Sequence, residues 1–321
     1  MKFLPFLLIL SSAAFSQQVS TENQPRRTIT AQRTDAVPKI DGIDSEEIWR
    51  TAISYGQFTE YQPTNGKPED PQFRTEVQIL FDDTAVYVFA KMFDPEPDQI
   101  SRELTERDQI GNDDFIGIFL NGYDDHMQSL EFIVQASGVQ FDAKQTPDLG
   151  EDDTWNAVWN SAVKMTDYGW AVEMRIPFSE LRFPKKQEQK FGINFFRNIQ
   201  RQQKKLTFSH VDNRKGNLGQ YDAALVGIEN IDTPVRLSFL PYLSTYLNSH
   251  QKKTTANVNG GMDLKYGISD AFTLDLTLIP DFGQANFDEV VLNLGPFEQQ
   301  FQENRSFFTE GTELFNKGNL F

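Results

Sequence analysis

The sequence predicts an all-β protein in which a β-sandwich is followed by the first strands of an antiparallel β-barrel that this chain does not complete. Three observations carry this prediction. Short strand-like runs separated by turn signals fill the region from Val37 to about Asp232, longer alternating runs follow Thr233, and almost no long helical period interrupts either part. Many short strands with frequent turns are typical of a sandwich, whereas long alternating strands are typical of a membrane barrel.

The predicted sandwich strands alternate between apolar and polar residues or are apolar throughout. Trp170–Ile176 alternates most clearly, because every second residue is large and apolar. The one convincing helical turn is Ser45–Ala52, which places Ile48 and Ala52 on the same face. The other predicted strands are Val77–Phe81, Val86–Phe93, Phe115–Leu120, Leu130–Ala136, Val139–Lys144, Phe191–Phe196 and Ala223–Ile228.

The runs after Thr233 are longer. Arg236–Asn248 and the two arms of a hairpin at Val258–Ile279 each have one apolar and one polar face. Each arm has roughly the length of a tilted membrane strand, about 9–11 residues. Three strands do not close a barrel, which needs about eight, and an open sheet edge is not viable in hydrocarbon. We therefore expect the chain to be a fragment of a longer protein. The alternative is that these strands belong to a soluble sheet.

The first residues predict export. Lys2 provides a positive start, Phe3–Leu10 is an apolar segment too short to span a membrane, and Ala14-Phe15-Ser16 has the small-residue pattern of signal-peptide cleavage. We expect residues 1–16 to be a signal peptide and residues 17–35 a flexible lead-in. The absence of cysteine excludes disulfides and thiolate chemistry. The net charge of −16 argues against nucleic acid as a partner.

A short signature opens the predicted sandwich at Pro38–Trp49, and four further segments follow it in order. Together they make residues 36–232 resemble family 9 carbohydrate-binding modules. The resemblance implies a jelly-roll-like β-sandwich, usually non-catalytic, that binds an oligo- or polysaccharide in an aromatic cleft and carries structural calcium. The four segments are Ala85–Pro95, Asp114–Leu120, Glu131–Phe141 and Trp170–Leu181.

Residues 233–321 resemble a second family, the outer-membrane β-barrel domain of unknown function that follows such modules in Bacteroidota-type proteins. This resemblance implies that the protein lies in the bacterial outer membrane, that lipid contacts its barrel, and that the sandwich is periplasmic or at the cell surface. The residues that carry it are Ile279–Gln284, Asn293-Leu294, Phe297-Glu298 and Glu303–Gly311.

The sugar contacts known in the first family have no counterparts here. A Trp and a Glu of the family fall at Gly111 and Gly117, and a ligand Arg falls at Ile133. A second Trp, expected around Asp212–Leu218, is absent. The resemblance therefore implies the fold without the family's own sugar site.

Other residues are candidates for sugar binding, which needs an aromatic face and polar neighbours. Trp155 is the best substitute platform, in the loop 151–156, and the alternative is its partial burial over the rim of the sandwich. Tyr123, Tyr61 and Asn112 lie in other loops and complete the candidate set. The remaining tryptophans, Trp49 included, are expected in the core.

A calcium site is predicted from three carboxylates. Asp94 ends one predicted strand, and Asp113 and Asp114 precede another. If the two strands are antiparallel neighbours, the carboxylates meet at one end of the sheet. Calcium takes about six to eight oxygen ligands, which carboxylates and loop carbonyls provide. The alternative is that these acids only cap turns.

Three functions are compatible with these observations. The first is a non-catalytic carbohydrate-binding module of an exported outer-membrane barrel protein, which captures or positions a glycan. The second is a transport or assembly barrel whose sandwich is a plug or docking domain without sugar binding. The third is a protein associated with glycosidic-bond hydrolysis. It is the weakest of the three, because no histidine lies in a recognisable catalytic motif.

Overall fold

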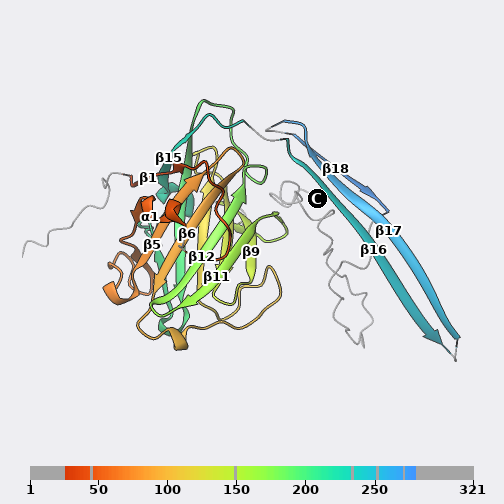
Figure 1. The fold of residues 1–321 in the computed structure, drawn as a ribbon, viewed down its shortest axis with the longest axis horizontal. Helices are drawn as coiled ribbons and strands as arrows, with labels where there is room; N and C mark the ends of the chain where they lie inside the picture. The colour runs from red at the N-terminus through yellow and green to blue at the C-terminus, as the bar shows by residue number, and fades with distance from the viewer. Residues whose placement is uncertain are drawn as a thin grey trace, which may run out of the picture.

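The computed structural model describes residues 26–43, 46–147, 150–232, 235–250, 253–269 and 272–279. The predicted signal peptide, residues 17–25 of the lead-in and the motifs of residues 281–321 lie outside these ranges. The described chain forms two sheets that pack as a β-sandwich and a third sheet of three strands (Figure 1). The all-β sandwich is therefore confirmed. Over the same ranges, no helix has both the length and the apolar character needed to cross a membrane.

The larger sheet of the sandwich has the strand order β1-β15-β13-β7-β8-β9-β10, with β14 pairing with β13 and β4 pairing with β14. All of these pairs are antiparallel except β1 with β15. Its strands are β1 (Thr28–Thr30), β4 (Thr59–Gln62), β7 (Phe115–Asn121), β8 (Ser129–Gln135), β9 (Gln140–Thr146), β10 (Gly150–Asp152), β13 (Glu188–Ile199), β14 (Lys204–Thr207) and β15 (Ala223–Glu229).

The smaller sheet has the order β11-β12-β6-β5-β2, and β3 pairs with β5. The single α-helix of the described residues, α1 (Glu47–Thr51), covers the outer face of this sheet. The strands are β2 (Gln32–Arg33), β3 (Ser54–Tyr55), β5 (Thr75–Phe81), β6 (Ala85–Phe93), β11 (Asn160–Thr166) and β12 (Gly169–Pro177).

The hydrophobic core lies between the two sheets. Side chains alternate across a strand, so one set of each strand faces inward. Trp170 and Val172 of β12 and Phe132 of β8 are fully buried there, as the alternating pattern predicted. The intervening residue Glu173 points to the opposite face, where it accepts hydrogen bonds from the signature segment.

Residues 38–43 and 46–49 of the signature segment pack on the outer face of the smaller sheet. The Trp49 indole donates to Glu173 at 2.7 Å, and the amides of Asp41 and Gly42 donate to its other oxygen at 2.9 and 3.0 Å. Trp49 is buried against Phe89, which confirms its predicted core role. Glu173 is therefore the anchor that holds this segment.

Arg197 of β13 ties the two sheets together. It is fully buried, and its guanidinium donates to the backbone carbonyls of Phe73, Arg74 and Phe93 and to the Thr75 hydroxyl. Burial lowers the pKa of Arg197 to about 10 despite the nearby carboxylates. These bonds cross from the larger sheet to the smaller one.

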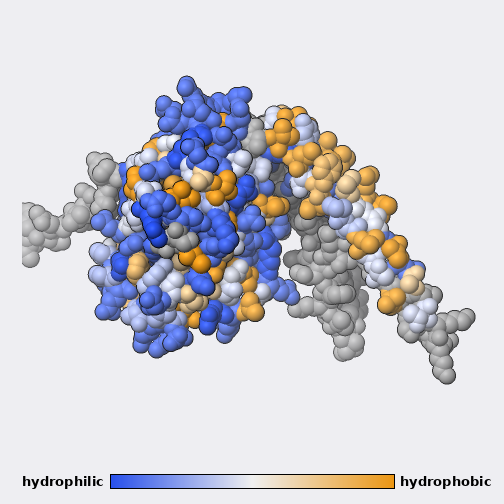
Figure 2. Space-filling view, in the orientation of Figure 1, coloured by the Kyte–Doolittle hydropathy of each residue, from blue (hydrophilic) through white to orange (hydrophobic). Residues whose placement is uncertain are grey.

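The third sheet contains β16 (Leu237–His250), β17 (Lys253–Gly267) and β18 (Thr273–Leu278), paired antiparallel in chain order. Its register places apolar residues opposite one another, as in the pairs Phe239–Leu264 and Leu264–Leu276. Figure 2 shows hydrophobic residues gathered along this sheet, whereas the visible face of the sandwich is mainly hydrophilic. The alternating runs are thus strands, as predicted, and the membrane barrel stays a prediction.

Candidate functional site

The outer face of the larger sheet is covered by the chain itself. Phe119 and Phe196 project from β7 and β13 and pack with Val211, Leu218 and Tyr221 of the loop 208–222. Asn194 of β13 holds the start of this loop, because its amide nitrogen donates to the Ser209 carbonyl and its oxygen accepts from the Ser209 amide. The loop therefore has a fixed position over the sheet.

The family's ligand positions on this face are filled as well. A Cβ added to Gly117 would lie 2.8 Å from the Ile133 side chain, and one added to Gly111 would lie 2.8 Å from Thr105. Ile133 packs with Phe115 and Phe141 in a small apolar cluster. A longer side chain at Gly117 would have to displace Ile133, so this face has no space for the family's contacts.

A cavity of about 710 Å³ lies beside the covering loop. This volume is within the range of about 300–1,000 Å³ that is typical of ligand sites. Its walls come from the N-terminal segment, the start of β4, the turn between β7 and β8, and the loop 208–222. The side chains that matter most are those of Arg27, Gln57, His126, His210, Lys215 and Tyr221.

Arg27 is a cation of the cavity that backbone carbonyls hold in place. Its guanidinium lies 3.7 Å from the centre of the Phe208 ring and donates to the carbonyls of Gly56, Gln57 and Phe208. Burial lowers the pKa of Arg27, and Glu69 raises it. Arg26 instead forms an ion pair with Asp124 at the rim.

Two acids line the cavity in different environments. Asp212 is bound by Arg214 at 2.9 Å, and this hydrogen bond lowers its pKa to about 2. Asp222 is 3% exposed, and burial raises its pKa to about 8. Its Oδ2 has no hydrogen-bond partner and lies against Gly192 of β13, where an added Cβ would meet it at 2.9 Å. At neutral pH, Asp222 is therefore mostly uncharged.

The four residues predicted for sugar binding are not brought together. Trp155 packs edge-to-face on Phe132, with ring centres 5.9 Å apart, on the core side of the larger sheet. Tyr61 packs on Phe196, on the opposite side of that sheet. Tyr123 is 42% exposed and Asn112 is also exposed. None of the four lines the cavity.

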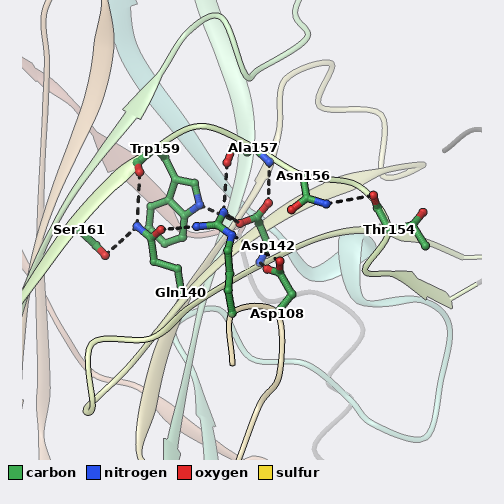
Figure 3. A network of polar contacts seen from close by, with 9 residues as sticks. Asp108, Gln140, Asp142, Thr154, Asn156, Ala157, Trp159 and Ser161 are labelled. Carbon is green, nitrogen blue, oxygen red and sulfur yellow. Dashed lines mark hydrogen bonds and ion pairs between the residues drawn. The ribbon is translucent and has the colours of Figure 1, made fainter. Parts of the chain in front are cut away.

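The loop that carries Trp155 is fixed by a buried polar network (Figure 3). Asp142 of β9 is fully buried and accepts from the Trp159 indole at 3.0 Å, from the Ala157 amide at 2.6 Å and from Arg107. Arg107 also donates to Gln140. This network anchors loop 154–159, and Trp155 is half-buried at the rim of the sandwich, where it lines a separate cavity of about 460 Å³.

The structure corrects the premise of the calcium prediction. The strands β6 and β7 belong to different sheets, so Asp94 and Asp113–Asp114 are not at the end of one sheet. Burial raises the pKa of Asp114 to about 6, and the nearby charge of Asp94 contributes to this rise. The three carboxylates are therefore still close to one another. The sheets converge there around Arg197.

Protein donors already bind these carboxylates. Asp94 accepts from Arg201 at 2.6 Å, Asp113 from the Glu103 amide at 2.7 Å, and Asp114 from the Gln200 amide. The second oxygens of Asp94 and Asp113 are buried without a partner. Two free oxygens beside two arginines fit a calcium ion poorly. Among the described residues, no group of three or more Asp, Glu or His is placed to hold a metal.

Protein-family models match both parts of the chain. A model described as carbohydrate family 9 binding domain-like matches residues 40–221, more than half of the chain. The chain belongs to this family. A second model, for a domain of unknown function (DUF5916), matches residues 233–321. No curated protein matches the chain.

The chain is also similar to solved structures. A family 9 module from Caldicellulosiruptor kristjanssonii is 18% identical in its glucose complex, with a TM-score of 0.46 and coverage of 65% of this chain and 100% of that one. Its cellotriose complex is also 18% identical, with a TM-score of 0.45 and coverage of 63% and 93%. A putative carbohydrate-binding protein from Bacteroides uniformis is 10% identical, with a TM-score of 0.50 and coverage of 63% and 99%. At such identities the likeness concerns the fold alone.

Sequence reasoning missed the residues of the cavity. Arg27 lies in the segment that was predicted to be a flexible lead-in, yet β1 begins directly after it. Tyr221 follows the stretch Asp212–Leu218, in which a family Trp was sought, by only three residues. A search extended to all aromatic residues of that loop would have found Tyr221.

Proposed function

We propose that the sandwich is a non-catalytic module that binds saccharides in the cavity beside Tyr221. The observation that carries this proposal is the convergence of an aromatic ring and several hydrogen-bonding side chains on one cavity of a family 9 fold. Sugars bind where an aromatic ring meets their C–H face and polar side chains meet their hydroxyls. Tyr221 offers the ring, and Gln57 and Gln220 offer amides.

The two acids of the cavity support a binding role over hydrolysis. Glycosidases place two carboxyl groups on either side of one bond, at separations of about 5 to 9.5 Å. Asp212 is engaged by Arg214, and the free oxygen of Asp222 lies against β13. Neither carboxyl group is therefore free to act as a nucleophile or base in the cavity.

The test is a screen of the full chain on a glycan array, followed by calorimetric titration of the best ligand. Tyr221→Ala should weaken binding about tenfold, which corresponds to about 1.4 kcal/mol and to the loss of one stacking contact. Tyr266→Ala removes an exposed tyrosine outside the cavity and is the matched control. The proposal is wrong if no glycan binds, or if both variants bind as the wild type does.

We further propose that β16–β18 form part of the wall of an outer-membrane β-barrel and that the protein is exported. The signal-peptide pattern and the distribution of apolar residues support this. Leu243 and Leu247 of β16 and Val258 of β17 are each more than 60% exposed and share one face. A hydrocarbon environment would bury them, whereas water leaves them exposed at a cost of about 25 cal/mol per Å².

The absence of native cysteine permits a clean test. Leu243→Cys and the neighbouring control Ser244→Cys place one thiol on each face of β16. Each variant is labelled with an environment-sensitive fluorophore and the full chain is reconstituted in phospholipid vesicles. Only the label at Leu243 should shift to the blue and be quenched by brominated lipid. Equal quenching at both positions, or none, would refute lipid contact on one face.

One observation favours a docking role for the sandwich as a second candidate. Arg182 of the sandwich donates to the Thr273 hydroxyl of β18 at 3.1 Å. Burial raises the pKa of Glu180, and the charge of Lys265 on β17 partly opposes this rise. A cavity of about 530 Å³ lies between loop 154–159 and these strands. The sandwich therefore contacts the polar face of the third sheet. In this case Arg182→Ala should increase protease cleavage between the two parts, without changing saccharide binding.

A further inference from the structure

The cavity beside Tyr221 carries positive charge although the chain as a whole has a net charge of −16. Among the described residues, Arg27 and Lys215 form no ion pair, since the ion pairs at the rim are Arg26 with Asp124 and Asp212 with Arg214. Asp222 is mostly uncharged at neutral pH because burial raises its pKa to about 8. Neither side chain is therefore in direct contact with a carboxylate, and the more distant charges of Glu69 and Asp212 act on Arg27 and Lys215 only across space.

Arg27 has unused hydrogen-bonding capacity. A guanidinium has five N–H donors, and Arg27 commits its Nη atoms to three backbone carbonyls. Those bonds and the contact with Phe208 hold its plane in place without neutralising its charge. A fixed, partly desolvated guanidinium binds a carboxylate more strongly than a mobile surface lysine does, because less side-chain entropy is lost.

Two imidazoles extend this polar surface. The buried Nδ1 of His210 has no hydrogen-bond partner. His126 uses its Nδ1 to contact the Gly219 carbonyl at 2.6 Å, and its ring also lines the cavity. In a neutral His126 ring the N–H donates to the Gly219 carbonyl, so Nε2 can donate to an anionic oxygen only when the ring is protonated, whereas no hydrogen bond at Nδ1 of His210 engages the N–H of that ring. The cavity is thus richer in donors than in charged acceptors.

We propose that the cavity selects acidic saccharides, namely glycans whose sugar units carry a carboxylate, such as uronic acids. Arg27 and Lys215 bind the carboxylate, and Tyr221 lies against the sugar ring. This inference rests on the proposed saccharide binding at the same cavity and adds the ligand class. An acidic surface repels such glycans elsewhere, so the cationic cavity gives both affinity and a unique point of attachment.

The test compares two ligands that differ only in this group. They are a β-1,4-linked glucose oligomer and the β-1,4-linked glucuronic acid oligomer of equal length, each titrated calorimetrically into the full chain. At about 20 mM salt, the acidic oligomer should bind at least about tenfold more tightly. At about 500 mM salt the preference should fall severalfold, because salt screens exposed charges.

A charge variant locates the effect. Lys215→Gln should reduce the preference for the acidic oligomer severalfold, because Lys215 is exposed and contributes its charge without supporting the fold. Lys186→Gln removes the same charge from an exposed lysine outside the cavity and should retain the preference. Arg27→Lys is the second variant, which keeps the charge and removes the planar fork.

The outcomes separate this inference from the function on which it rests. Equal binding of the two oligomers, or an equal loss of preference in both lysine variants, overturns the acidic-saccharide inference and leaves saccharide binding intact. If the array and both oligomers give no binding, the proposed function itself is refuted, and this inference with it.

Discussion

Replacing Glu131 with Gln should change how the stability of the sandwich depends on pH. Glu131 of β8 is 1% exposed, and its Oε2 has no hydrogen-bond partner. Burial raises its pKa to about 9 from an ordinary value of 4.5, and the charge of Glu151 raises it further. The folded protein therefore holds a proton on Glu131 that the unfolded chain releases at neutral pH.

The direction and size of the change in the free energy of unfolding follow from this difference in proton binding. When the folded state binds more protons than the unfolded state, the free energy of unfolding falls as the pH rises. The fall begins near the unfolded pKa of 4.5 and ends near the folded pKa of about 9. Each pH unit in this window costs about 1.4 kcal/mol, so going from pH 5 to pH 8 costs about 4 kcal/mol. A glutamine has the same shape and no such cost.

Urea denaturation of the wild type and Glu131→Gln at pH 5, 6, 7 and 8 measures this effect. The difference in the free energy of unfolding between the variant and the wild type should grow by about 4 kcal/mol from pH 5 to pH 8, since all other titrating groups are common to both. Glu151→Gln should flatten the dependence only in part, because burial still acts on Glu131. Parallel stability curves for Glu131→Gln and the wild type would show that Glu131 is ionised in the fold.

Three further predictions test other parts of the structure. Trp49→Phe should cost about 1–3 kcal/mol in urea denaturation, because Glu173 loses a buried hydrogen-bond donor, and a change below about 0.5 kcal/mol would contradict this. Trp155→Ala should lower the free energy of unfolding by about 2 kcal/mol through lost packing on Phe132 and leave glycan titration unchanged; weakened glycan binding would support the predicted platform role of Trp155. Removal of calcium with EGTA should leave Tm unchanged, since Arg201 already binds Asp94; a lower Tm would support the predicted metal site.

The sequence predicted strands where burial imposes a pattern. The strand β12 lies between two neighbours and alternates strictly, so its period of two was visible. The edge strand β11 escaped detection, because Asn160–Thr166 is mostly half-exposed and carries few large apolar residues. The sequence also did not indicate that β6 and β7 belong to different sheets, because both strands are buried on both faces and are apolar runs without alternation.

The candidate site was harder to predict than the fold. Arg27, His126 and Tyr221 are separated by about a hundred residues each along the chain and meet only through the pairing of distant strands. No local spacing signals such a cavity. The resemblance placed the sugar site on the outer face of the larger sheet. There, Phe119 and Phe196 pack against the chain's own loop 208–222.

The first strand of the sandwich also determines when the domain can finish folding. Thr28 of β1 pairs with Ala224 of β15, and Ala31 then leads into β2, which pairs with Leu80 of the other sheet. The first strand of the sandwich, β1, therefore pairs with its last strand, β15, at the edge of the larger sheet. A chain that is synthesised from its N-terminus cannot pair β1 in the larger sheet until Ala224–Val226 has been made. Until then the edge of β13 lacks its β15 neighbour, and such an edge is open to pairing with other chains. The order of the strands therefore leaves the edge of β13 as the site where pairing with another chain can compete with the completion of the sandwich.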